Sequence, residues 1–185
     1  MREESAPFKI SSQGFTLIEL VVAFSIIAVL STIGIASFVS YSRTQALQQA
    51  ANDLIVTLNT AKSKSIAQVK PDDINCLPPS GNALLNGYQV VLNKTTNSYT
   101  LSAICNGTPD ALSNATTKLY GITFDLSTFV PASATKMTVT FTILNGGVTS
   151  SNGNVNAQRA TSILLKGATG VTPKTIIITA GGLIE

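Results

Sequence analysis

The chain has 185 residues and a formal charge of +3, and its composition is 44% hydrophobic but only 11% charged. Soluble domains carry about 25% charged residues, so the composition indicates one folded domain joined to a separate apolar segment. The absence of histidine removes the commonest general base and metal ligand, and so small a net charge does not by itself indicate a nucleic-acid partner.

The N-terminal region divides into a polar leader and a long apolar run. Residues 1–14 are of mixed charge, whereas residues 15–39 contain a single charged residue, Glu19. About 20 apolar residues are enough for a helix to cross the hydrocarbon core of a bilayer. We therefore expect residues 15–39 to form a single transmembrane helix, preceded by the leader.

The helix is expected to continue beyond the membrane. Residues 41–69 contain neither proline nor glycine, and their apolar residues recur at spacings of three and four, which is typical of an amphipathic helix. The expected buried stripe consists of Leu47, Ala51, Leu54, Leu58 and Ala61. Pro71 cannot continue a helix. We predict one helix from Phe15 to about Val69, with residues 40–70 as its amphipathic half.

Residues 71–185 consist of short β-type runs separated by turn residues. The predicted strands are Tyr88–Leu92, Tyr99–Ile104, Leu119–Phe124, Met137–Leu144, Thr161–Leu165 and Thr175–Thr179. The first two should form a hairpin, Asn145-Gly-Gly is a strong turn signal, and Ala180-Gly-Gly should turn the chain into Leu183. Thr149–Asn156 is predicted to be a mobile loop. The expected fold class is α+β, with a β-rich domain packed on the amphipathic half of the helix.

Cys76 and Cys105 are the only cysteines, which are too few for a Cys-rich zinc site. Because the expected membrane segment precedes them, both should lie outside the cytoplasm, where a disulfide can form. A bond between them would close a loop of about 30 residues and stabilise the domain by about 3–4 kcal/mol. Two unlinked buried thiols are the alternative.

Glu19 is the informative residue of the apolar run. A carboxylate inside a membrane helix costs about 2.5–3.5 kcal/mol on insertion scales, so Glu19 needs a partner. A cut after Gly14 would create a positively charged α-amine on Phe15. The amine of a neighbouring subunit, shifted by about one helical turn, would then offset the desolvation of Glu19 and fix the stagger between subunits. The alternative is a lone Glu19 that is protonated or reaches the membrane surface.

The string from Gly14 to Val22 (Gly-Phe-Thr-Leu-Ile-Glu-Leu-Val-Val) resembles the class III signal of type IV pilins and of type II secretion pseudopilins. The resemblance implies that a prepilin peptidase removes residues 1–14, that Phe15 is N-methylated, and that Glu19 is the assembly glutamate. Residues 42–54 and 61–67 are similar to the helix of the FimT/GspH minor-pilin group. The implied fold is pilin-like, with a long N-terminal helix packed on an antiparallel sheet.

The resemblance also implies a location and partners. We expect a bacterial inner-membrane protein whose C-terminal domain, residues 71–185, is periplasmic or extracellular before the subunit joins a pilus or pseudopilus. The expected partners are the prepilin peptidase, other pilin or pseudopilin subunits, the assembly platform protein and its ATPase. The predicted function is that of a structural subunit, minor rather than major. The alternatives are a DNA-binding minor pilin for natural transformation and a tip adhesin.

Other chemistry is not expected. Asp72, Asp73, Asp110 and Asp125 are too scattered for a calcium loop, so neither a metal nor a cofactor is predicted. Nothing between residue 72 and the C-terminus forms a catalytic set, so we do not expect an enzyme. The last part of the chain has few basic residues, which are Arg159, Lys166 and Lys174. We therefore do not predict a nucleic-acid site.

Overall fold

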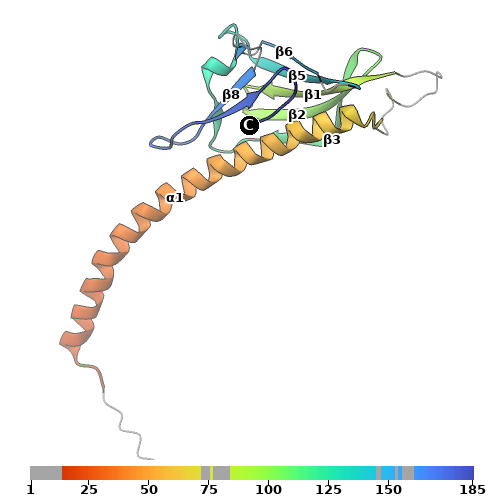
Figure 1. Cartoon of the computed structure of the whole chain (residues 1–185). Helices are drawn as coiled ribbons and strands as arrows, with labels where there is room; N and C mark the ends of the chain where they lie inside the picture. Colours follow the sequence, from red (N-terminus) through yellow and green to blue (C-terminus); the bar gives the residue numbers. More distant parts are fainter. Residues whose placement is uncertain (1–13, 72–75, 77–83, 145–146, 153, 156–160) are drawn as a thin grey trace, which may run out of the picture. The chain divides into compact units, whose positions relative to one another are not determined.

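The computed structural model describes residues 14–71, 76, 84–144, 147–152, 154–155 and 161–185. The chain divides into two units, residues 1–39 and residues 40–185. A single helix, α1 (Leu17–Ile66), contributes to both units, and every strand belongs to the second (Figure 1). The fold is α+β, as predicted from the sequence.

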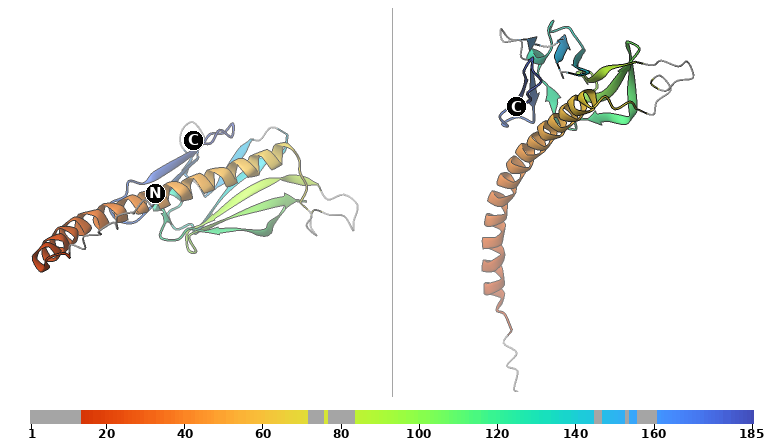
Figure 2. Two further views of the ribbon diagram at one scale, coloured as in Figure 1. Left: turned by 90° about the horizontal axis from the view of Figure 1, so that it is seen from below. Right: turned by 45° about the vertical axis from the view of Figure 1, so that its right-hand side comes forward.

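The amphipathic half of α1 buries the predicted stripe. Leu47, Ala51, Leu54, Leu58 and Ala61 are all buried in one cluster with side chains from the strands. Their spacing of three and four places them on one side of the helix. Figure 2 shows this half of the helix lying across the strands. The prediction of an apolar stripe is confirmed.

α1 ends three residues earlier than predicted. Gln68 has a φ of 52°, and the backbone N–H groups of Gln68 and Val69 bond to the carbonyls of Ser65 and Lys64. This pair of bonds is a Schellman C-cap, which usually has glycine at the left-handed position. This helix has Gln68 at that position instead, so no glycine marks its end in the sequence.

The strands form two antiparallel sheets. The first sheet has the order β3-β2-β1-β5-β6, and the second has the order β4-β8-β7, with β9 also pairing with β8. The bounds are β1 Leu85–Asn93, β2 Ser98–Cys105, β3 Thr108–Lys118, β4 Thr123–Phe124, β5 Lys136–Thr142, β6 Val148–Ser151, β7 Asn154–Val155, β8 Thr161–Lys166 and β9 Lys174–Ile178, with a short 3-10 helix, η1, at Leu126–Thr128. Thr161 Oγ1 donates to Ser150 Oγ at 2.8 Å and joins the two sheets.

Two hydrogen bonds fasten the end of α1 to the first sheet. The buried Ser65 hydroxyl donates to the Phe141 carbonyl at 2.8 Å, and the Tyr88 hydroxyl donates to the Val69 carbonyl. Burial raises the pKa of Tyr88, which keeps its hydroxyl protonated as a donor. Buried polar groups need such partners to offset their desolvation. These bonds therefore fix where the helix ends on the sheet.

Several strand predictions are confirmed and others are wrong. The hairpin of β1 and β2, the strands β5, β8 and β9, and the turn from Thr179 to Leu183 are observed. The predicted strand Leu119–Phe124 is wrong because Gly121 turns the chain with a φ of 70°, leaving only Thr123 and Phe124 as β4. The predicted mobile loop Thr149–Asn156 contains β6 and β7 instead. Residues 145 and 146 of the predicted Asn-Gly-Gly turn lie outside the described residues.

Cys76 and Cys105 form a disulfide, with their Cα atoms 5.4 Å apart and both side chains buried. The bond attaches Cys76, which follows α1, to the last residue of β2. The sequence-based prediction of this bond is confirmed. It closes a loop between residues 29 apart in sequence, which restricts the unfolded chain.

Breaking this disulfide should destabilise the second unit. We expect Cys105→Ser to lower the free energy of unfolding by about 3 kcal/mol, because the unfolded chain regains the entropy of an open loop. Thermal unfolding with and without a thiol reductant measures the effect. The melting temperature of the double variant Cys76→Ser/Cys105→Ser should not change when reductant is added. If reductant also left the melting temperature of the wild type unchanged, the prediction would be contradicted.

Asp125 should make the stability depend on pH in acid. Lys166 forms a salt bridge with Asp125, and the Ser127 backbone N–H donates to its Oδ1. These contacts lower the pKa of Asp125 from 3.8 to about 2, and the hydrogen bond from Lys166 has the largest effect. A carboxyl with a lowered pKa stabilises the fold above its unfolded-state pKa, and that contribution is lost as the pH falls through the folded-state pKa.

Asp125→Asn should therefore melt at a lower temperature than the wild type at pH 7. The difference in melting temperature between the variant and the wild type should shrink as the pH falls from 3.8 to about 2. Calorimetry across this pH range measures it. Lys166→Gln is the matched variant and should show the same narrowing. A difference that stayed constant down to pH 2 would show that the ion pair does not contribute.

Candidate functional site

The N-terminal end of α1 is defined by a side-chain cap. Thr16 precedes the helix, and its Oγ1 accepts a hydrogen bond from the backbone N–H of Glu19 at 3.3 Å. Thr16 and Glu19 are three residues apart, the spacing of a capping box. The cap fixes Leu17 as the first helical residue, so the peptide bond between Gly14 and Phe15 lies outside the helix.

Gly14 and Phe15 are accessible. A Cβ built on Gly14 would meet no described atom within 4 Å, and the Phe15 side chain is 83% exposed. Neither residue contributes to packing within the described part of the chain. The space around the Gly14–Phe15 bond is therefore open to a second protein.

The helix after Phe15 presents apolar side chains on every side. Leu20, Val21 and Val22 follow one another around one turn, and all three are exposed. The other exposed large hydrophobic residues of this segment are Phe15, Leu17, Ile18, Phe24, Ile26, Ile27, Val29, Leu30, Ile35, Phe38 and Val39. A helix that is apolar all round belongs in an apolar environment, so this segment requires a partner.

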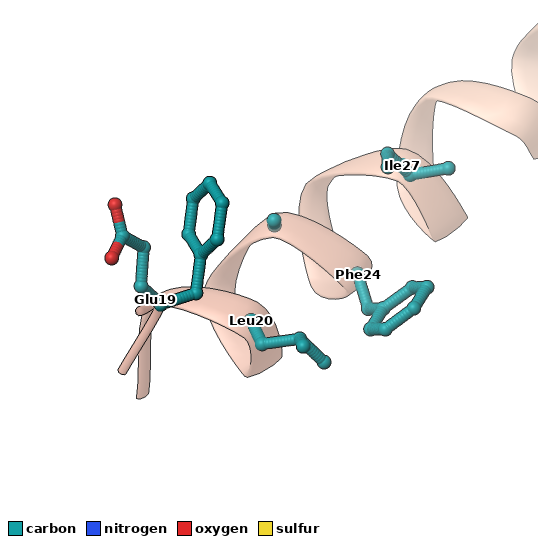
Figure 3. A pocket seen from close by; sticks show the side chains of 6 residues that line it. Glu19, Leu20, Phe24 and Ile27 are labelled. Atoms are coloured by element: carbon teal, nitrogen blue, oxygen red, sulfur yellow. The ribbon is translucent and has the colours of Figure 1, made fainter. Parts of the chain in front are cut away.

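Glu19 is the only charged residue between Gly14 and Val39. It lines a shallow, open hollow of about 260 Å³ together with apolar side chains of the first turns, which are Phe15, Leu20, Ala23, Phe24 and Ile27. Figure 3 shows the Glu19 carboxylate extending away from Leu20, Phe24 and Ile27. A carboxylate in the first turn is favoured by the helix dipole. The charge is therefore compatible with the helix, but a partner that buries this segment would have to supply a counter-charge for Glu19.

Two hydroxyl groups of the apolar segment, those of Ser25 and Ser31, already have hydrogen-bond partners. Ser25 Oγ donates to the Val21 carbonyl at 2.8 Å, and Ser31 Oγ donates to the Ile27 carbonyl at 2.7 Å. Such bonds to the carbonyl four residues back keep a hydroxyl from costing free energy when it leaves water. These serines therefore do not oppose burial, and the charge of Glu19 dominates the polarity of the segment.

The predicted transmembrane span of residues 15–39 is not confirmed. Within the part of the chain that the structure describes, no helix combines the length and the apolar character needed to cross a membrane.

Comparison with protein families identifies the N-terminal segment. Residues 10–35 match the family model described as the prokaryotic N-terminal methylation motif. The chain carries a prepilin-type N-terminal methylation motif. The match includes Gly14, Phe15 and Glu19, and the motif supports a type IV pilin or pseudopilin subunit. It implies processing by a prepilin peptidase and assembly with other pilin subunits.

Comparison with curated proteins and with solved structures gives no significant match. The motif covers only the N-terminal segment, and the FimT/GspH subgroup predicted from residues 42–67 is not confirmed. The functional assignment therefore depends on the motif and on the physical properties of the residues it contains.

The structure brings the predicted site residues to one end of α1. Gly14 and Phe15 precede the helix, and Glu19 lies in its first turn, on the same side as Phe15 in the hollow described above. Thr16 was not predicted as a helix cap, although Thr-Leu-Ile-Glu has the residue pattern of a capping box. Glu19 thus occupies a position that also defines the start of the helix.

Proposed function

We propose that this chain is a structural subunit of a type IV pilus or a type II secretion pseudopilus, processed after Gly14 and assembled through residues 15–39. The observation that carries the proposal is one carboxylate, Glu19, on an exposed helix that is otherwise apolar on all sides. A lone soluble domain gains nothing from such a segment. A filament whose subunits pack these helices together gains a core.

Burial of the apolar segment supplies the favourable free energy of assembly. Burying an exposed leucine, isoleucine, valine or phenylalanine contributes about 1.5–3 kcal/mol per side chain. The segment exposes such residues on successive turns, from Leu17 to Phe38. Even partial burial between neighbouring copies outweighs the desolvation of one carboxylate, provided that the carboxylate has a partner.

Removal of residues 1–14 would supply that partner. The new α-amine on Phe15 is positive at neutral pH, and it lies four residues before Glu19, just before the first helical residue, Leu17. A neighbouring copy displaced along the helix axis by about one turn, or roughly 5 Å, could bring its amine level with Glu19. The pair then fixes the axial register between neighbouring subunits, because any other stagger leaves both charges without a partner in apolar surroundings.

Before assembly, the proposed location is the bacterial inner membrane, with the second unit outside the cytoplasm. The buried disulfide between Cys76 and Cys105 supports an oxidising compartment for that unit. An assembly platform protein and its ATPase are the proposed partners that move the subunit into the filament. Minor status and membership of the FimT/GspH group are part of the proposal, and so is a non-enzymatic role.

DNA binding is not favoured. Lys166, one of the few basic residues late in the chain, is engaged by Asp125. Phosphate contacts depend on available lysine and arginine side chains, so this pairing weakens the case for a nucleic-acid surface there.

Processing is tested by Gly14→Val. The substitution places a branched side chain beside the proposed cleavage bond, and we expect the precursor to accumulate with residues 1–14 still attached. Mass spectrometry of the purified chain measures this. Because a Cβ at Gly14 meets no described atom, the fold should be unaffected, and an unchanged melting temperature is the control. Normal cleavage of Gly14→Val would contradict the proposed site.

Assembly is tested by Glu19→Gln. Glutamine keeps a capping-box residue after Thr16 but removes the charge, so we expect normal cleavage and loss of filaments by about tenfold or more, corresponding to at least ~1.4 kcal/mol of pairing. Electron microscopy and quantification of sheared filaments measure the yield. Thr16→Val is the matched control, because it removes the cap and keeps the charge. Wild-type filament yield from Glu19→Gln would show that the proposed pair has no role.

A further inference from the structure

Two hollows lie next to each other on the second unit and have no place in the function proposed above. One measures about 250 Å³ and the other about 220 Å³, and Ala46, Tyr120 and Ile122 line both of them. Because they share these three residues, the two adjacent hollows are here called the Tyr120 trough. Its remaining lining residues are Ser42, Arg43, Gln49, Ala50, Asp53, Tyr99, Thr117, Lys118, Leu119, Gly121, Gly167 and Ala168.

One wall of the trough is the face of α1 that begins directly after the apolar segment. Ser42, Ala46 and Ala50 are four residues apart and therefore lie on one side of the helix. Their small side chains leave space beside the helix, whereas the larger Leu47 and Leu54 are buried on the neighbouring side. From Ser42 to Asp53 this wall extends about 16 Å along the helix axis.

The opposite wall holds Tyr120 in the open. Leu119 and Ile122 are only 8% and 5% exposed, yet Tyr120 between them is 85% exposed. Gly121 turns the backbone with a φ of 70°, which lets Leu119 and Ile122 both face inward. A fixed turn between two buried side chains thus presents the Tyr120 ring to solvent at the boundary of the two hollows.

The polar groups around the ring have both signs of charge and both hydrogen-bonding roles. Gln49, Asp53 and Lys118 are among the residues that line the larger hollow. Arg43 and Ser42 are among those that line the smaller one. Among the described residues, no salt bridge involves Arg43, Asp53 or Lys118. These donors and acceptors are therefore available to a ligand.

The geometry points to the Tyr120 trough as a binding site for a neutral carbohydrate chain. Sugar rings combine apolar C–H faces, which pack on an aromatic ring, with hydroxyl groups that both donate and accept hydrogen bonds. The exposed ring and the mixed polar groups match these two requirements. The two hollows, of about 250 and 220 Å³, share Tyr120 as a lining residue, which places it to contact adjoining sugar units.

The same groups argue against a nucleic-acid strand. Single-stranded nucleic acid also stacks on aromatic rings, but it requires a positive groove along its phosphates. Asp53 lines the larger hollow together with Lys118, so the charges there offset each other and the trough is not a continuous positive groove. A neutral hydroxylated chain needs no such groove and can donate to the carboxylate.

A glycan array tests this inference with the full chain kept in a detergent that has no sugar headgroup. We expect binding to a subset of neutral oligosaccharides, and titration calorimetry with the best of them gives the affinity. Tyr120→Ala should weaken that affinity about tenfold or more, as is typical of an aromatic residue central to a site. Tyr120→Phe should retain it, because the ring remains.

Tyr41→Ala is the matched control, because Tyr41 is 64% exposed and lines neither hollow. Its affinity for the same oligosaccharide should equal that of the wild type. Asp53→Asn should weaken sugar binding, since the carboxylate accepts from hydroxyl groups more strongly than an amide does. A lack of binding to every neutral glycan, or equal binding by Tyr120→Ala, would overturn the inference.

Two further measurements separate the remaining occupants. A single-stranded 20-nucleotide probe should not bind; binding that Asp53→Asn strengthens and salt weakens would identify a polyanion site instead. Filament yield of Tyr120→Ala should equal that of the wild type. A loss of filaments in Tyr120→Ala with glycan binding unchanged would identify the trough as a contact between copies and would overturn the inference, while leaving the proposed assembly through Glu19 intact.

Discussion

The apolar segment of α1 is the constraint on which the rest of the chain depends. The helix is a single element of secondary structure, yet its two halves have different requirements. Between Leu47 and Ala61 it needs one buried stripe, and the strands of the second unit supply it. Between Leu17 and Val39 it is apolar on every side, and the large apolar side chains that the structure describes there are exposed. The free energy available from burying that surface has to come from another molecule, so the segment is complete only in an assembly.

In the proposed assembly, Glu19 connects this requirement to proteolysis. In the precursor, its charge lies in an apolar segment without a counter-charge in the described chain, which opposes close packing of the helix with its neighbours. Cleavage after Gly14 would create the counter-charge on Phe15 at the same end of the segment. Thr16 keeps the start of the helix in place, because the cap lies on the retained side of the cleaved bond. On this view, processing changes the electrostatics of assembly without changing the helix itself.

The parts of the fold that follow from local periodicity could be predicted from the sequence, whereas those set by tertiary pairing could not. The stripe from Leu47 to Ala61 and the alternating residues of β5 each repeat with the period of their element. β3 is a polar strand, Thr-Pro-Asp-Ala-Leu-Ser-Asn-Ala-Thr-Thr-Lys, and it forms because β2 offers an edge for pairing. The end of α1 at a left-handed Gln68 also lacks a sequence signal. The residues of the candidate site could be predicted, because Gly14, Phe15 and Glu19 lie close together in the sequence and form one recognisable motif.

The Tyr120 trough could not be foreseen, because four segments that are separated in the sequence form it. Its polarity also decides between its possible occupants. A stable contact between copies has an apolar centre from which charged residues are depleted, and burying Arg43, Asp53 and Lys118 there would require each to find a well-placed partner. A carbohydrate replaces water with hydroxyl groups and leaves these side chains hydrogen-bonded. Burial of the apolar segment away from water is therefore favourable, whereas the trough is suited to a ligand whose hydroxyl groups replace the hydrogen bonds of water.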